Sequence, residues 1–186
     1  MDEKQREYVI FAGVNGAGKT TYYHAFDGFP KNRVNVDEIL QEMGGNWREP
    51  SDCVLAMREA VRQVKWNLEN GHSFQQETTL AGRGIRNTIL HAKKCGYAVR
   101  MFYIGLESAD LAVLRVADRV RKGGHGVAES DIRRRYEASL RMLREIIILC
   151  DRVDILDNTR KFDRVATYEK GIETFRKECE WYDRIM

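Results

Sequence analysis

Short apolar runs alternate along the chain with longer segments in which apolar residues recur every three or four positions. Residues 8–12 and 97–104 are largely apolar, as strands buried on both faces are. The intervening segments have the spacing of amphipathic helices, and Ser51 and Gly71 stand where a cap and a stop are expected. The predicted strands cover residues 8–12, 33–36, 73–77, 97–104, 153–156 and 164–168. The predicted helices begin at Lys19 and Asp37, cover residues 51–70, 83–95, 108–122 and 129–149, and include one at the C-terminus.

This alternation predicts an α/β fold with a mostly parallel central sheet of about five to six strands flanked by helices. No internal repeat, linker or low-complexity segment interrupts the pattern, and Pro30 and Pro50 both fall in expected loops. We therefore expect a single domain over residues 1–186. Ligands of such sheets bind at the carboxyl ends of the strands, which directs attention to the residues that follow each strand.

The first strand is followed by Gly-Val-Asn-Gly-Ala-Gly-Lys-Thr at residues 13–20, a complete G-x-x-x-x-G-K-[ST] phosphate-binding loop, or P-loop. Its glycines let backbone N–H groups face the phosphates, Lys19 reaches the β- and γ-phosphates, and the Thr20 hydroxyl can ligate Mg²⁺. The motif predicts a P-loop NTPase-type domain that binds a nucleoside triphosphate and Mg²⁺. The expected nucleotide-binding residues here are Gly13, Asn15, Gly16, Ala17, Gly18, Lys19, Thr20 and Thr21.

Two carboxylates follow the next two strands. Asp37 could accept the proton of an attacking hydroxyl as a general base, or it could simply cap the helix that begins there. Glu77 could hold Mg²⁺ through water or bind a substrate hydroxyl together with Thr78, or it could be a solvated carboxylate at a strand end.

Residues 107–135 have the composition of a lid. Arg115, Arg119 and Lys122 share one face of the expected helix, and Gly123-Gly-His-Gly126 supplies a glycine-rich hinge. Phosphoryl transfer needs positive charge near the γ-phosphate, so this group of basic residues is expected to supply at least one ligand. Arg119 is assigned a catalytic role, and Arg115, His125 and Arg134 are assigned to the substrate, although each could equally be a surface residue or, for His125, a packing or capping residue.

Several strings together resemble the zeta-toxin-like P-loop kinases, in particular their chromosomal branch. The matching stretches run in order from about residue 8 to residue 160: GVNGAGKTT at 13–21, NVDEI at 35–39, FQQETTL at 74–80, GYAV at 96–99, YIGLESADLA at 103–112, RVADRVRKGGHGV at 115–127, IRRRYEASL at 132–140 and DNT at 157–159. The E-T-T-L string followed by R-V-x-x-R-V-x-x-G-G-H-x-V is the specific part.

The resemblance implies an ATP-dependent kinase with Asp37 as base, Glu77 at the substrate, lid arginines at the γ-phosphate and Asn158 near the adenine. Toxin members of the family phosphorylate the amino-sugar unit of a UDP-activated cell-wall precursor, which makes a UDP-sugar the implied acceptor. This chain is shorter than the plasmid-borne toxins and has Gly-Gly-His in place of their arginine-bearing lid segment. Phosphoryl transfer therefore carries over, while the acceptor stays open, and an antitoxin partner cannot be inferred from one chain.

Composition narrows the alternatives. With 31 basic and 28 acidic residues the net charge is only +3, and the three tryptophans are scattered, which argues against a nucleic-acid partner. Four dispersed cysteines, a charged N-terminus and no apolar run long enough for a bilayer predict a cytoplasmic protein with no membrane segment. A P-loop ATPase or GTPase switch is the second reading, although D-x-x-G and N-K-x-D strings are absent, and a nucleoside or polynucleotide kinase is the third.

Overall fold

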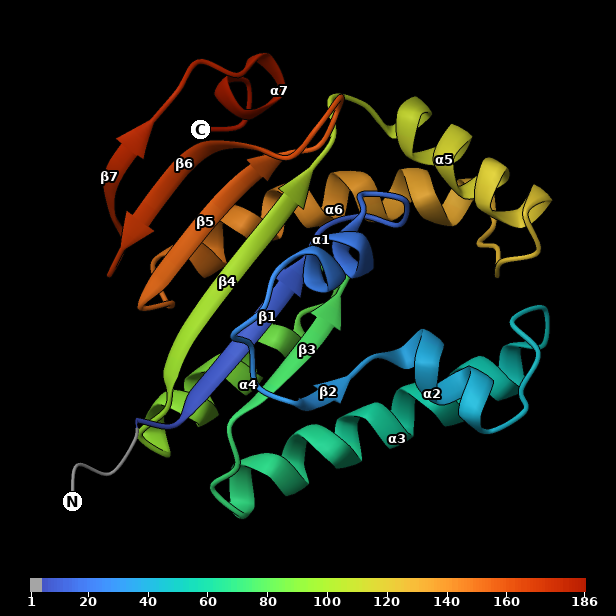
Figure 1. Ribbon diagram of the computed structural model, residues 1–186, viewed down its shortest axis with the longest axis horizontal. Coiled ribbons are helices and arrows are strands. Elements are labelled where there is room, and N and C mark those ends of the chain that lie inside the picture. The colour runs from blue at the N-terminus through green and yellow to red at the C-terminus, as the bar shows by residue number, and fades with distance from the viewer. Residues whose placement is uncertain (1–4) are drawn as a thin grey trace.

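A seven-stranded sheet forms the centre of the computed structural model, which describes residues 5–186 (Figure 1). The strand order is β2-β3-β1-β4-β5-β6-β7, with β2 to β5 parallel and the last two strands antiparallel. The strands are β1 (Glu7–Ala12), β2 (Asn32–Val34), β3 (Phe74–Thr78), β4 (Ala98–Gly105), β5 (Arg152–Asp157), β6 (Asp163–Glu169) and β7 (Ile172–Arg176). The predicted α/β class with a mostly parallel sheet is confirmed.

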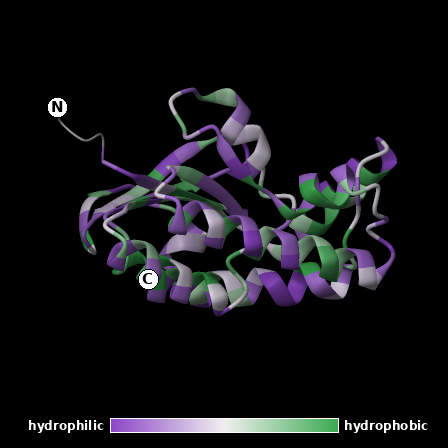
Figure 2. Ribbon diagram, turned by 90° about the horizontal axis from the view of Figure 1, so that it is seen from below, coloured by the Kyte–Doolittle hydropathy of each residue, from purple (hydrophilic) through white to green (hydrophobic). Residues whose placement is uncertain are grey.

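Helices lie on both sides of this sheet. Figure 1 shows α4 and α6 behind the central strands and α1 in front of β1. In Figure 2 hydrophilic and hydrophobic residues alternate along the flanking helices, which is the amphipathic pattern read from the sequence. The helices are α1 (Lys19–Ala25), α2 (Val36–Glu42), α3 (Pro50–Glu69), α4 (Gly84–Lys94), α5 (Ala109–Arg121), α6 (Glu129–Ile147) and α7 (Glu180–Asp183). None of these helices is long and apolar enough to cross a membrane.

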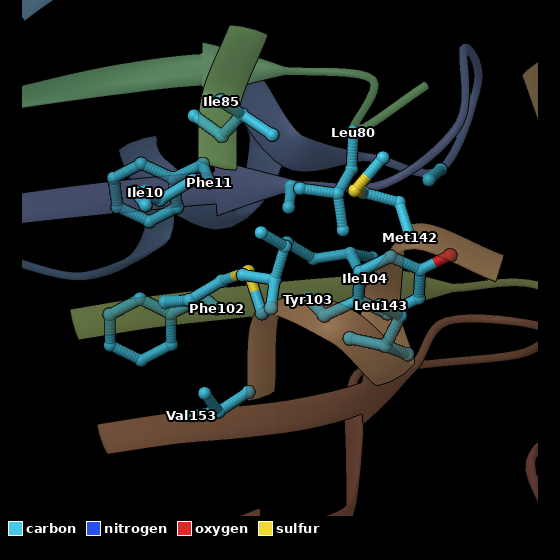
Figure 3. Close-up of a cluster of buried hydrophobic side chains, with 14 of the residues drawn as sticks. Ile10, Phe11, Leu80, Ile85, Phe102, Tyr103, Ile104, Met142, Leu143 and Val153 are labelled. Atoms are coloured by element: carbon cyan, nitrogen blue, oxygen red, sulfur yellow. The ribbon is translucent and has the colours of Figure 1, made fainter. Parts of the chain in front are cut away.

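The core lies between the central strands and α6. Figure 3 shows Phe102, Tyr103 and Ile104 of β4 among side chains from β1, β5 and α6. The hydroxyl of Tyr103 is fully buried but lies 3.1 Å from the Ser139 hydroxyl on α6, so its polar end is satisfied. This packing fixes the carboxyl ends of the parallel strands relative to one another.

Three local predictions were wrong. The second strand stops at Val34 instead of residue 36, because Asn35 caps α2 by accepting a hydrogen bond from the Asp37 amide. Asp37 is therefore in the first turn of α2 and is not its cap. Ser51 is not a cap either, since α3 begins at Pro50, whose fixed φ and missing N–H suit a first helical position.

The third difference is at the C-terminus, where strand β7 and the four-residue α7 replace the expected helix. Lys170 and Gly171 both have positive φ, at 50° and 80°, the backbone of a tight hairpin turn. Every residue of β7 is exposed. Its sequence therefore lacks the alternation of buried apolar and exposed polar residues from which a strand is predicted.

Candidate active site

The loop between β1 and α1 wraps closely against its neighbours. A Cβ on Gly13, which has φ of 138°, would lie 2.1 Å from the Ile104 carbonyl oxygen. A Cβ on Gly18, the residue before α1 with φ of 93°, would lie 2.6 Å from Nδ2 of Asn158. Both positions therefore require glycine by conformation and by space.

Lys19 folds back over this loop. Its Nζ donates to the Val14 carbonyl at 3.1 Å and lies 3.7 Å from Oε1 of Glu77. The side chain is buried, and burial lowers the pKa of Lys19, although the Glu77 and Asp37 carboxylates oppose that shift. A buried ammonium with this little compensation is well placed to bind a phosphate.

Glu77, near the end of β3, collects polar groups from three elements. Its Oε2 accepts hydrogen bonds from the Thr20 hydroxyl at 2.8 Å, Arg33 Nη2 at 2.9 Å and Asn35 Nδ2 at 3.2 Å. The alternative of a solvated carboxylate does not hold, because the Glu77 side chain is only 10% exposed. The sequence analysis did not identify Arg33 and Asn35. Their spacing of two residues could have pointed to them, because side chains two apart along a strand lie on one face of the sheet and Arg33 pairs with Gln75, two residues before Glu77.

The Thr20 and Glu77 oxygens suit a Mg²⁺ ion bound together with phosphate. Magnesium takes few protein ligands and keeps several waters, so one hydroxyl and one carboxylate form an adequate donor set. Within residues 5–186 no group of three or more His, Cys, Asp or Glu residues could hold a metal alone. The residues present thus fit a nucleotide-borne ion better than a separate metal centre.

Asp37, in the first turn of α2, contacts the loop between α5 and α6. Its Oδ2 lies 2.7 Å from Nε2 of His125, an ion-pair distance without the alignment of a hydrogen bond. Burial acts to raise the pKa of Asp37, but the His125 imidazole and the charges of Lys19 and Arg119 outweigh it, and the pKa lies below the usual value. Asp37 is accordingly a carboxylate near neutral pH.

Arg119 completes this charged group from α5. Its Nε donates to the His125 carbonyl at 2.9 Å, while its Nη2 is buried and has no hydrogen-bond partner among the described residues. Burial lowers the pKa of Arg119, and the charges of Asp37 and Glu77 partly offset that shift. A buried guanidinium nitrogen without an acceptor marks a place for an anion.

The other two lid residues assigned to the substrate contact protein groups. Arg115 donates through Nη2 to the Asn158 and Thr159 carbonyls, at 2.8 and 3.1 Å. Asn158 Nδ2 in turn donates to the Ala17 carbonyl at 2.8 Å, so this loop is tied to the P-loop. Arg134 is 64% exposed and pairs with Asp131.

The neighbouring arginine makes the P-loop contact instead. Arg135 Nη1 donates to Asn15 Oδ1 at 3.2 Å, and one residue along a helix turns a side chain by about 100°. Thr78 Oγ1 accepts from the Leu80 amide at 3.1 Å and so supports a turn, and Thr21 is exposed on α1.

The chain is similar to known proteins in sequence over part of its length and in fold over all of it. No family model matches the chain. An uncharacterised protein of Haemophilus influenzae is 27% identical over 132 residues, covering 71% of this chain and 94% of that protein. A chain from the PezAT chromosomal toxin–antitoxin system of Streptococcus pneumoniae is 20% identical with a TM-score of 0.67, over 100% of this chain and 78% of its own.

Two further solved structures share the architecture. A chain of the AvrRxo1-ORF1:-ORF2 structure with ATP is 16% identical with a TM-score of 0.69, over 99% of this chain and 64% of its own. The chain shares the fold of the PezAT and AvrRxo1 chains. A chain of the Pnkp1/Rnl/Hen1 RNA repair complex is 16% identical with a TM-score of 0.60, over 77% of this chain and 47% of its own. In this parallel sheet the carboxyl ends of the neighbouring strands β1, β2 and β3 lie at one edge, which explains why Lys19, Asp37 and Glu77 converge.

Proposed function

We propose that the protein is an ATP-dependent kinase that transfers the γ-phosphoryl group of ATP to a hydroxyl of a small molecule. The observation that carries this proposal is the convergence of an ionised carboxylate, Asp37, with two buried cations, Lys19 and Arg119, around the end of the P-loop. A P-loop hydrolase could use the same carboxylate to orient an attacking water, so the dependence of phosphoryl transfer on an acceptor separates the two functions. The shared fold of the AvrRxo1 structure with ATP supports the choice of nucleotide.

In the proposed transfer one bond forms, one bond breaks and one proton moves. Asp37 takes the proton of the acceptor hydroxyl while the hydroxyl oxygen forms a bond to the γ-phosphorus. The bond between the γ-phosphorus and the β,γ-bridging oxygen breaks, and ADP is released. Lys19 and the free Nη2 of Arg119 neutralise charge on the transferring group. Thr20 and Glu77 would hold Mg²⁺, which neutralises phosphate charge when it is bound.

The acceptor is the finer part of the proposal. We take a UDP-activated amino sugar as the first candidate because the sequence resembles the zeta-toxin-like kinases, whose toxin members use such an acceptor, and because the fold is shared with a chain of a toxin–antitoxin system. A polynucleotide 5′-hydroxyl is the second, favoured by the fold shared with the RNA repair complex. Because the fold is shared with a chain of the PezAT toxin–antitoxin system, we also propose that an inhibitory protein binds this chain. We further propose that residues 1–186 form one catalytic domain and that it acts in the cytoplasm.

The first prediction tests the activity itself. Purified protein with γ-labelled ATP and Mg²⁺ is offered UDP-sugars, nucleosides and 5′-hydroxyl oligonucleotides, and transfer of label to one class is expected. Lys19→Ala should reduce kcat by about 10³-fold or more, because it removes a charge-assisted contact that follows the moving phosphoryl group. His24→Asn, at an exposed position of α1, is the matched control.

A folded Lys19→Ala protein, judged by circular dichroism, that transfers label at the normal rate would contradict the proposal. Release of inorganic phosphate at an equal rate with and without every acceptor would favour the ATPase or GTPase reading instead.

A further inference from the structure

The loop between α5 and α6 is wedged between Arg119 and the segment that joins α2 to α3. A Cβ on Gly124 would lie 2.6 Å from Cγ of Arg119, and a Cβ on Gly126 would lie 2.7 Å from Cη2 of Trp47. Both glycines are thus in close contact with a large side chain on either side of His125. The loop is docked onto the α2–α3 segment in this structure.

His125 contacts both groups that the proposed reaction uses, one through its backbone and one through its ring. Its carbonyl oxygen accepts from Nε of Arg119 at 2.9 Å, and its ring Nε2 lies 2.7 Å from Oδ2 of Asp37. Each contact occupies one atom of its partner. Oδ1 of Asp37 is left for an acceptor hydroxyl, and Nη2 of Arg119 is left without a partner among the described residues.

We infer that His125 is a positioning residue that orients the base Asp37 and the cation Arg119 together, so that both reach their working geometry only when the loop is docked. This inference rests on the proposed kinase function. The charged groups facing the pair are Lys19 and Arg119, which favour the Asp37 carboxylate, and Glu77 beyond them. His125 Nε2 is buried beside Oδ2 of Asp37 and has no other hydrogen-bond partner among the described residues.

Two amide substitutions separate positioning from packing. Glutamine can place its Nε2 where the histidine ring has Nε2, whereas asparagine places its amide nitrogen near the ring Nδ1 and falls short of Asp37. We expect His125→Asn and His125→Ala to lower kcat by about 10- to 100-fold with KM for ATP changed less than about twofold. His125→Gln should recover most of that loss, and His24→Asn should have no effect.

The contact can also be read without turnover. Amide hydrogen exchange of residues 123–127 in the nucleotide-free protein should accelerate in His125→Ala and in Asp37→Asn, and the double variant should add little to either, because both remove the same contact. Multiplicative effects on exchange, or equal kcat values for the glutamine, asparagine and alanine variants, would overturn the inference.

These results are distinguishable from a failure of the proposed function. If Lys19→Ala and Asp37→Asn abolish transfer while His125→Ala is silent, the kinase assignment stands and the positioning role falls. If no acceptor is phosphorylated, the exchange experiment still decides whether His125 holds the loop against Asp37: acceleration without additivity supports the contact, and unchanged exchange rejects it.

Discussion

Asp37 and Asp154 show how the same residue type serves two purposes at different depths. Burial would raise the pKa of each carboxyl, and in each case cationic neighbours reverse the shift and hold the pKa below its usual value. Asp154, fully buried in β5, accepts hydrogen bonds from Arg100, Arg152 and Thr167, so its partners are complete. Asp37 keeps an oxygen free at the lid, which is the difference between a structural carboxylate and a candidate base.

Asp37→Asn is expected to leave ATP affinity within about twofold and to lower kcat by about 10²–10⁴-fold, since the amide keeps the shape but cannot accept a proton. The lowered pKa of Asp37 means that the base stays ionised well into the acid range. We therefore expect kcat/KM of the natural protein to show no Asp37 limb above about pH 5. An active Asp37→Asn variant would remove Asp37 from the mechanism.

Asp154→Asn is expected to destabilise the protein by about 1–3 kcal/mol at pH 7, because it removes a fully buried charge that accepts hydrogen bonds from Arg100 and Arg152, whose side chains are 40% and 36% exposed. A carboxyl whose pKa is lower in the folded state stabilises the fold above its unfolded pKa, and that contribution disappears as pH falls through the folded pKa. Urea unfolding at pH 7 and at about pH 3 should show the difference between the two proteins shrinking. A difference independent of pH would mean that packing, and not charge, dominates.

Within α5, the helical repeat separates arginines that look equivalent in sequence. Arg115 holds the loop that carries Asn158, Arg119 has a buried Nη2 without a hydrogen-bond partner among the described residues, and Arg121, 78% exposed, pairs with Asp118 on the surface. Their different partners predict different kinetic effects.

Arg119→Ala should lower kcat more than it raises KM for ATP, because its contact strengthens as charge develops on the transferring group. Arg121→Ala is the control and should be kinetically silent. Hydrogen exchange across residues 115–130 should slow when a non-hydrolysable ATP analogue binds, as expected for a lid. If Arg119→Ala is as silent as the control, the guanidinium has no part in transfer.

Over the whole molecule, the C-terminal segment packs against the carboxyl ends of β4 and β5. Trp181 packs directly on Gly105, at the end of β4, where a Cβ would lie 2.2 Å from its ring. Its Nε1 donates to Oδ1 of Asp157 at 3.0 Å, and the same oxygen accepts from the Thr159 amide. The chain end and the loop bearing Asn158 are therefore one packed unit.

Trp181→Ala is expected to cost about 3–5 kcal/mol, through lost burial and an unfilled cavity over β4. Thermal unfolding should begin roughly 10 °C lower or more. Phe175→Ala, at a half-exposed position of the β7 edge, is the control and should change stability by less than about 1 kcal/mol. Equal effects of the two substitutions would mean that α7 does not support the core.

The local sequence determined the P-loop, the parallel strands and the approximate extent of most helices, because glycine conformation, apolar runs and helical periodicity are properties of neighbouring residues. It also placed Asp37 shortly after one strand and Glu77 near the end of another, where the topology of a parallel sheet gathers side chains. Only the tertiary structure decided what those side chains contact. Arg33 and Asn35 reach Glu77 across a strand pairing, Arg135 and not Arg134 faces Asn15, and β7 exists because it pairs with β6. These outcomes depend on strand register and on helix rotation. A shift of one residue moves a strand side chain to the other face of the sheet and turns a helix side chain by about 100°. Packing between segments far apart in the chain sets both.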